Sequence, residues 1–208
     1  MLTQHKTYGG EFSPPHRIIV GMIDSGASVL EVGCGLGGLT QALRNDLGCR
    51  VTAVELDERL ACVAQEFTDK MIVGSIESND TWNQIEGSFD YVIFADVLEH
   101  LVNPWDVLRR VRGVLADNGS VIISIPNIAF YRVRLKLLLG RFDYAPLGIL
   151  DDTHLRFFTL KTAKAMLAET GFRMTDFSTT TWGTIAQMGM RRFPGIFAYE
   201  FIMKAVID

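Results

Sequence analysis

The sequence lacks several features that mark whole classes of protein. It has only three cysteines in 208 residues, at positions 34, 49 and 62, and their odd number and spacing exclude a disulfide framework or a C-x-x-C metal module. Charged residues or proline interrupt every apolar run before it reaches eighteen residues, and no apolar stretch follows a basic N-terminus. We therefore expect no membrane span, no export and a cytoplasmic protein. A net charge of -4 gives no basic excess, which argues against a nucleic-acid partner.

The residues that are present alternate, from position 27 onward, between short β-branched runs and helical patterns. This order is typical of parallel strands joined by crossover helices. It predicts an α/β fold with an open, doubly wound sheet, whose ligand site lies beyond the carboxyl ends of the strands. The expected strands are 29–32, 50–55, 71–74, 89–95 and 120–125, followed by two late strands at 172–180 and 198–206.

Local signals predict several boundaries. Asp57, Asn103 and Thr159 are expected to cap the N-termini of helices, and Asn118-Gly119 predicts a turn into the fifth strand. An inserted helix is expected at 127–141, followed by a loop-like stretch to 158. The apolar stretch 193–207 is either a core strand or a subunit contact, which leaves a homodimer open.

The first crossover carries EVGCGLGG at 31–38, in which two patterns overlap. Glycines 33, 35 and 38 spell G-x-G-x-x-G, the fingerprint of a phosphate cradle. Glycines 33, 35 and 37 after an acid spell E-x-G-x-G-x-G, which suits a cationic cofactor without phosphate. Glu55, at the end of the second strand, can bind ribose hydroxyls in either case.

The electric charge of the bound cofactor distinguishes these two patterns. Glu31 beside the glycine turn would repel a pyrophosphate and attract an ammonium or sulfonium group, and the glycine loop holds no lysine or arginine. Asp96, just after the fourth strand, adds a third carboxylate to the same rim. The balance favours a cationic cofactor. An NAD-dependent oxidoreductase remains the alternative.

Five segments in order resemble the class I S-adenosylmethionine-dependent methyltransferases. The resemblance implies a Rossmann-like fold with a mostly parallel seven-stranded sheet, helices on both faces, S-adenosyl-L-methionine as cofactor and a small-molecule acceptor. The segments are VLEVGCGLGGLTQAL at 29–43, VTAVELDERL at 51–60, IVGSIES at 72–78, FDYVIFADVLEHL at 89–101 and LADNGSVIISIPN at 115–127. Binding of the cofactor without catalysis, in a regulatory module, is a second alternative.

The resemblance also implies roles for single residues. Many family members carry an acid where this chain has Ser75, so the adenine amino group is expected to contact backbone groups or Glu77. The implied cofactor contacts are Glu31, Gly33, Gly35 and Gly37 around the methionine part, Glu55 on the ribose, Leu56, Ser75 and Ile76 around the adenine, Ala95 and Asp96 near the sulfur, and Tyr8 closing the pocket.

The segment 124–172 is similar to a subgroup of bacterial methyltransferases that accompany glycosyltransferases in surface-polysaccharide pathways. This similarity implies a sugar-linked hydroxyl acceptor. We therefore expect one domain over 1–208, with an N-terminal arm and helix at 1–26, a cofactor-binding core at 27–127, an inserted helix and acceptor-side lid at 128–158, and a C-terminal helix and strands at 159–208.

Methyl transfer from a sulfonium is an in-line displacement that needs alignment and a dry site, so no metal is expected. A hydroxyl acceptor benefits from a general base near neutral pH. His154 is the first candidate, oriented by Asp151 or Asp152, and His100 is the second. The basic and leucine-rich stretch 131–141 is a lid over an anionic acceptor, an interfacial helix, or a surface helix with solvated arginines.

Overall fold

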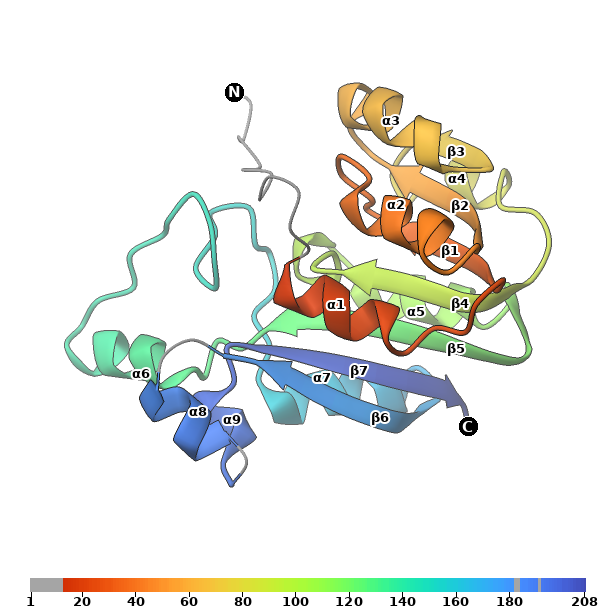
Figure 1. Ribbon diagram of the computed structural model, residues 1–208. Helices are drawn as coiled ribbons and strands as arrows, with labels where there is room; N and C mark the ends of the chain where they lie inside the picture. The colour runs from red at the N-terminus through yellow and green to blue at the C-terminus, as the bar shows by residue number, and fades with distance from the viewer. Residues whose placement is uncertain (1–12, 182–183, 191) are drawn as a thin grey trace.

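A seven-stranded sheet forms the centre of the protein in the computed structural model, which describes residues 13–181, 184–190 and 192–208 (Figure 1). The strand order is β3-β2-β1-β4-β5-β7-β6, and of these seven described strands only β7 runs antiparallel to its neighbours. This confirms the predicted α/β fold with a mostly parallel sheet. The strands are β1 Ser28–Val32, β2 Arg50–Glu55, β3 Lys70–Val73, β4 Phe89–Ala95, β5 Leu115–Pro126, β6 Phe172–Thr180 and β7 Glu200–Ile207.

Helices cover both faces of the sheet. In Figure 1, α1 and α2 lie in front of the strands, whereas α5 and α7 lie behind them. The helices are α1 Pro14–Val20, α2 Gly38–Asn45, α3 Glu58–Ala64, α4 Asn79–Trp82, α5 Pro104–Val111, α6 Tyr131–Leu138, α7 Leu160–Glu169, α8 Thr184–Met190 and α9 Pro194–Phe197, with 3-10 turns η1 Gln65–Phe67 and η2 Leu98–His100.

The central strands are apolar on both sides, which explains why they are covered twice. On β4, Ile93 packs with Ile19 of α1 and Leu43 of α2 in one cluster. Phe94, the next residue, points to the other face and packs in the cluster that contains α5 and α7. Alternate residues of one strand therefore build two separate cores.

The predicted helix caps are correct. Asp57, Asn103 and Thr159 each accept a backbone N–H at the start of α3, α5 and α7. The prediction for β5 was too short, because the strand begins at Leu115 and its pairing with β4 shifts before Ser120. The irregularity takes up the residues expected to form a turn.

The described residues in the last part of the chain form two short helices and one strand. The short helices α8 and α9 were not predicted, whereas β7 occupies most of the apolar stretch and pairs with β5 on one side and β6 on the other. The core-strand interpretation of this stretch is therefore correct. None of the described helices combines the length and the hydropathy that crossing a bilayer requires.

The strand order reverses between β1 and β4, which are paired neighbours although six described elements, including β2 and β3, separate them along the chain. The crossovers leave in opposite directions at this point, so the carboxyl ends of both strands border an open crevice. The glycine loop follows β1 and the Asp96 segment follows β4. The fold thus brings the two most informative sequence segments to one place.

Candidate active site

A cleft of about 910 Å³ opens at the carboxyl ends of the central strands. One end is formed by the glycine loop and the residues after β2 and β3, and the other by η2 and the loop before α7. Most of the predicted site residues line it. They are Glu31, Gly33, Gly35, Glu55, Leu56, Ser75, Ile76, Ala95, Asp96, His100 and His154.

The glycine loop keeps the backbone close to the cleft. Gly33 and Gly35 have positive φ values of 73° and 56°, which favour glycine. A Cβ on Gly33 would lie 2.5 Å from Val97 Cγ2, whereas one on Gly35 would meet nothing within 4 Å. Gly35 therefore borders open space. Gly37, by contrast, is not among the lining residues and makes room for Ala64 of α3.

Glu55 joins the end of β2 to this loop. Its Oε2 accepts a hydrogen bond of 2.8 Å from the Gly35 amide, and its Oε1 accepts one of 3.0 Å from the Asp57 amide. The side chain is largely buried but lines the cleft. A carboxylate accepts more than two hydrogen bonds, so Glu55 keeps acceptor capacity for a ligand.

Glu31 is more deeply buried, with 2% of its surface exposed. Thr40 donates a hydrogen bond of 2.7 Å to its Oε2. Burial raises the pKa of Glu31 to about 8, and the charge of Glu55 acts in the same direction against the Thr40 hydrogen bond. The sequence predicts a charged Glu31, whereas this raised pKa favours the protonated carboxyl at neutral pH unless a cation lies beside it.

The residues after β2 and β3 form one wall of this half of the cleft. Leu56 exposes 71% of its surface, and Ile76 is buried with its carbonyl 2.6 Å from Trp82 Nε1. Ser75 Oγ accepts a hydrogen bond from the Glu77 amide. The Glu77 carboxylate accepts from the amides of Val102 and Asn103, so it fastens the neighbouring loop.

Asp96 stands at the middle of the cleft in an unusual backbone conformation. Its φ of 55° makes it the one described non-glycine residue with positive φ, and such strain concentrates at functional sites. Ser124 Oγ accepts from the Asp96 amide and donates to Oδ1, each at 3.0 Å. Beside it, burial and then the charge of Asp96 raise the pKa of Glu200 well above its usual range.

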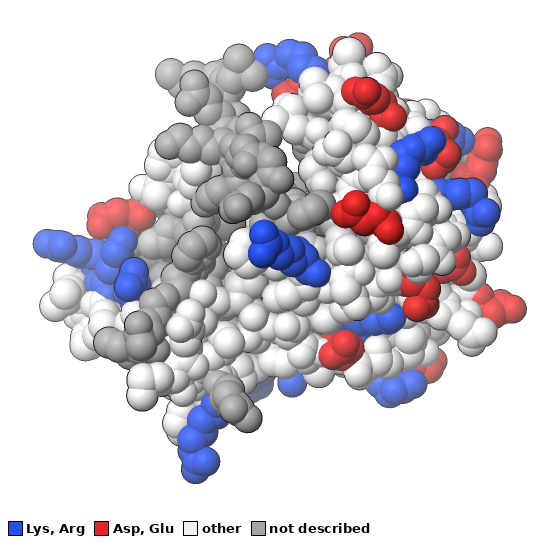
Figure 2. Space-filling model, viewed as in Figure 1, with Lys and Arg blue, Asp and Glu red and all other residues white. Residues whose placement is uncertain are grey.

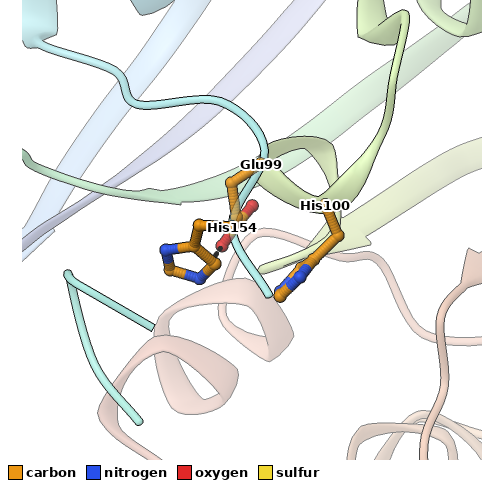
Figure 3. Close-up of side chains that lie close together, drawn as sticks. All are labelled: Glu99, His100 and His154. Carbon is orange, nitrogen blue, oxygen red and sulfur yellow. Dashed lines mark ion pairs between the residues drawn. The ribbon is translucent and has the colours of Figure 1, made fainter. Parts of the chain in front are cut away.

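Glu99, His100 and His154 come together at the other end (Figure 3). Glu99 Oε1 lies 3.9 Å from His154 Nε2, and the two imidazole rings meet edge to face with centroids 4.7 Å apart. The amides of Leu155 and Arg156 both donate to the Glu99 carbonyl at 2.9 Å. This backbone contact docks the loop before α7 onto η2.

Hydrogen bonds orient both rings, although not as the sequence suggested. His154 Nδ1 lies 3.2 Å from the Ile149 carbonyl, so neither Asp151 nor Asp152 holds it. Asp151 acts on the other ring through Thr153, whose Oγ1 lies 2.5 Å from Asp151 Oδ1 and 3.1 Å from His100 Nδ1. Burial lowers the pKa of His100, and electrostatic repulsion from His154 lowers it further.

Sequence reasoning missed three acidic or basic residues of the cleft. Glu99 has 1% exposure, and its pKa is raised well above the usual range by burial and then by Asp96. Glu200 comes from β7, and His16 comes from α1, where burial lowers its pKa against the pull of Asp96. Only Glu99 had a signal, as the acid directly before His100. Tyr8 lies outside the described residues.

Comparison with known protein families finds one that matches most of the chain. A family model described as a methyltransferase domain matches residues 12–176. Among curated proteins, the chain is 33% identical over 109 residues to a ubiquinone biosynthesis O-methyltransferase of Xanthomonas campestris pv. campestris, covering 49% of this chain and 44% of that protein. The chain thus spans less than half the length of this relative.

Solved structures agree on the fold. A TehB-like SAM-dependent methyltransferase from Corynebacterium glutamicum superposes with a TM-score of 0.64 at 16% identity, covering 96% of this chain and 90% of that one. Magnesium protoporphyrin IX methyltransferase from Synechocystis, solved with bound SAM, gives 0.59 at 16% identity, covering 93% and 76%.

Proposed function

Because the chain belongs to the class I S-adenosylmethionine-dependent methyltransferases, we propose that it transfers the methyl group to a hydroxyl of a small molecule, such as a sugar-linked metabolite. The similarity to an O-methyltransferase, which extends across about half of the chain, supports oxygen as the accepting atom. That relative belongs to ubiquinone biosynthesis, so it gives no support to the polysaccharide-pathway subgroup. Neither a nicotinamide enzyme nor a regulatory module is supported by the comparisons.

The glycine-loop end of the cleft suits the cofactor. The open space beside Gly35 accommodates the methionine part against the main chain. Glu55 supplies free acceptor capacity for the ribose hydroxyls, and the exposed face of Leu56 offers an apolar wall for the adenine. A phosphate-bearing cofactor would place negative charge against the Glu55 carboxylate, which is unfavourable in a partly buried site.

Asp96 lies between this end and the histidines. Its strained conformation holds the backbone after β4 at the point where the methyl group would face the acceptor. Ser124 fixes the side chain. We assign Ala95 and Asp96 to positioning at the sulfonium, because a carboxylate favours a nearby positive charge.

The histidine end suits the acceptor. The bound cofactor supplies an activated methyl group. In the transfer, the acceptor oxygen would bond to the methyl carbon as the carbon–sulfur bond broke, and the hydroxyl proton would pass to His154 or to water. We assign the activation of that hydroxyl to His154, with His100 beside it, because both rings line the cleft and are oriented by hydrogen bonds.

The surroundings of the histidines suggest the kind of acceptor. Leu147 and Gly148 from the loop after α6 line the same end of the cleft. Basic side chains gather at the end of the molecule that carries α6 (Figure 2), where Arg132 and Lys136 are exposed. An anionic or sugar-linked hydroxyl compound would match this combination of positive charge and apolar surface.

A single observation carries the proposal: one cleft joins the Glu55 and Gly35 pair to the oriented His154. The test is isothermal titration with S-adenosylmethionine, followed by mass spectrometry of hydroxyl compounds incubated with enzyme and cofactor. His154→Ala should lower turnover by about 100-fold or more and leave cofactor affinity nearly unchanged. Full turnover in His154→Ala would contradict its role, and binding of NAD without S-adenosylmethionine would contradict the function.

A further inference from the structure

The buried carboxylate of Glu99 accepts no hydrogen bond from any described residue. Only 1% of the residue is exposed, and neither Oε1 nor Oε2 has a hydrogen-bond partner in the described part of the chain. Asp96 and Asp151 lie near enough to repel its charge. Burial of an unpaired carboxylate is costly, so this side chain is placed for a positively charged ligand.

His154 turns a free nitrogen toward this carboxylate. Its Nδ1 lies 3.2 Å from the Ile149 carbonyl, and a carbonyl only accepts, so Nδ1 carries the proton. In the neutral ring Nε2 then has a lone pair, and this atom lies 3.9 Å from Glu99 Oε1. A backbone carbonyl that fixes the remote nitrogen is the usual support of a metal-binding histidine.

His100 has the same tautomer for a related reason. Thr153 has one hydroxyl proton, and the contact of 2.5 Å with Asp151 Oδ1 uses it. Thr153 Oγ1 and the Thr153 carbonyl can therefore only accept from His100 Nδ1. The Nε2 atom of His100 is left with a lone pair as well.

We propose that Glu99, His100 and His154 bind a divalent transition-metal ion of the zinc type. The three side chains each offer one ligand atom within 4.8 Å of the others, and Figure 3 shows the carboxylate of Glu99 directed at His154 with His100 alongside. Two imidazoles and one carboxylate form a donor set found in catalytic zinc sites, which leave a further position open. All three residues line the cleft.

The donor set decides the class of ion. Magnesium and calcium prefer oxygen ligands, whereas imidazole suits zinc, cobalt and nickel. Bonds of about 2.0 Å to zinc would bring tetrahedral ligand atoms to roughly 3.3 Å from one another. Ligand atoms that lie up to 4.8 Å apart must therefore approach one another by as much as about 1.5 Å on binding, which rotation of the two imidazoles and small shifts of the loop that carries His154 can supply.

The proposed ion deepens the role assigned to the histidines and in this respect rests on the proposed function. A single general base needs one nitrogen, but here two bare nitrogens and a carboxylate converge. An ion held by them would lower the pKa of the acceptor hydroxyl, as a Lewis acid does. The proton would pass to water, the oxygen would bond to the methyl carbon, and the carbon–sulfur bond would break.

Metal binding is tested without cofactor or acceptor. Protein carrying Cys62→Ser, which removes the one exposed thiol among the described cysteines, is stripped with a chelator and titrated with Co²⁺ by calorimetry and visible absorption. We expect one equivalent bound with tetrahedral or five-coordinate bands. Glu99→Gln and His154→Gln should each weaken binding by about 10-fold to 100-fold or more.

Glu58→Gln is the control, because Glu58 is an exposed carboxylate in the first turn of α3 and does not line the cleft. It should bind Co²⁺ as the parent protein does. Affinity for S-adenosylmethionine confirms that each variant is folded. Absence of Co²⁺ binding by the parent, or unchanged binding in Glu99→Gln, would overturn the proposal.

Methyl transfer is measured separately on the same stripped protein. A loss of turnover after stripping that Zn²⁺ or Co²⁺ restores would support the catalytic role. Stoichiometric Co²⁺ binding lost in Glu99→Gln supports the site even if no acceptor is methylated, in which case the proposed function fails. Undiminished methyl transfer by stripped protein that binds no Co²⁺ would reject the site and leave the function standing.

Discussion

Glu55 holds the backbone of Gly35 through a hydrogen bond of 2.8 Å from the glycine amide to Oε2. The two residues belong to different crossovers of the sheet, so one carboxylate links the end of β2 to the turn after β1. The acid expected to bind a ribose therefore also sets the shape of the glycine loop. Its two tasks can be separated by substitution.

Substitution of Glu55 should weaken cofactor binding in two steps. Glu55→Gln keeps an oxygen for the Gly35 amide but loses the charge, and should weaken S-adenosylmethionine binding by about 10-fold, as expected for one charge-assisted hydrogen bond. Glu55→Ala should weaken it further and lower the melting temperature. Titration calorimetry and thermal unfolding measure both effects. Glu58→Gln, an exposed acid in the first turn of α3, is the control, and wild-type affinity in Glu55→Ala would refute the assignment.

Gly33 should tolerate a side chain less well than a glycine in open space. In Gly33→Ala the new Cβ meets Val97 at 2.5 Å and φ is 73°. Gly26→Ala has a similar φ of 76° and nothing within 4 Å, so it carries only the backbone cost of about 1 kcal/mol. We expect the free energy of unfolding to fall by at least about 1 kcal/mol more in Gly33→Ala. Urea denaturation compares them, and equal losses would show that the Val97 contact is easily relieved.

Stability should fall as the pH rises through the titration of Glu31. Unfolded chains lose the Glu31 proton near the ordinary pKa of 4.5, whereas the folded protein holds it to about 8. The folded state therefore binds the extra proton between these values, and the free energy of unfolding decreases across this window by at most about 5 kcal/mol. Glu31→Gln should flatten this slope in urea unfolding at several pH values. A slope that is the same in both proteins would mean that Glu31 is not the group responsible.

The basic surface of α6 should govern affinity for an anionic acceptor. Arg132→Glu combined with Lys136→Glu reverses two exposed charges, and should raise KM for such an acceptor by roughly 10-fold while kcat changes little. Added salt should reduce the difference between variant and parent. Lys161→Glu on α7, also exposed, is the control. An unchanged KM at low salt would remove this surface from the acceptor site.

The cofactor half of the cleft could be predicted from the sequence because its residues follow strands directly. Glu31, Gly33 and Gly35 surround the carboxyl end of β1, and Glu55 ends β2. Parallel neighbours bring their carboxyl ends to one edge, so sequence position nearly determines the place in space. Gly37 shows the limit, because its contact is with α3 and depends on how two helices pack.

The acceptor half depends on contacts that no local pattern encodes. His154 reaches Glu99 because two backbone amides of its loop bond to the Glu99 carbonyl. Glu99 itself reads as an exposed acid of a short helix, and its burial follows only from the loop that covers it. Asp96 likewise gives no hint of its positive φ. The short helices α8 and α9 and the early start of β5 were missed because turns and an irregular pairing interrupt the periodic signal.

The position of β7 between β5 and β6 restricts the order in which the last two strands can join the sheet. Among the described strands, β6 pairs only with β7, so it joins the sheet either after β7 or together with it as a preformed pair. Until residues 200–207 arrive, the outer edge of β5 presents unpaired amides and carbonyls beside an apolar surface, the kind of edge that invites pairing between chains. The step that completes the sheet is thus also the step that protects the folding chain from self-association.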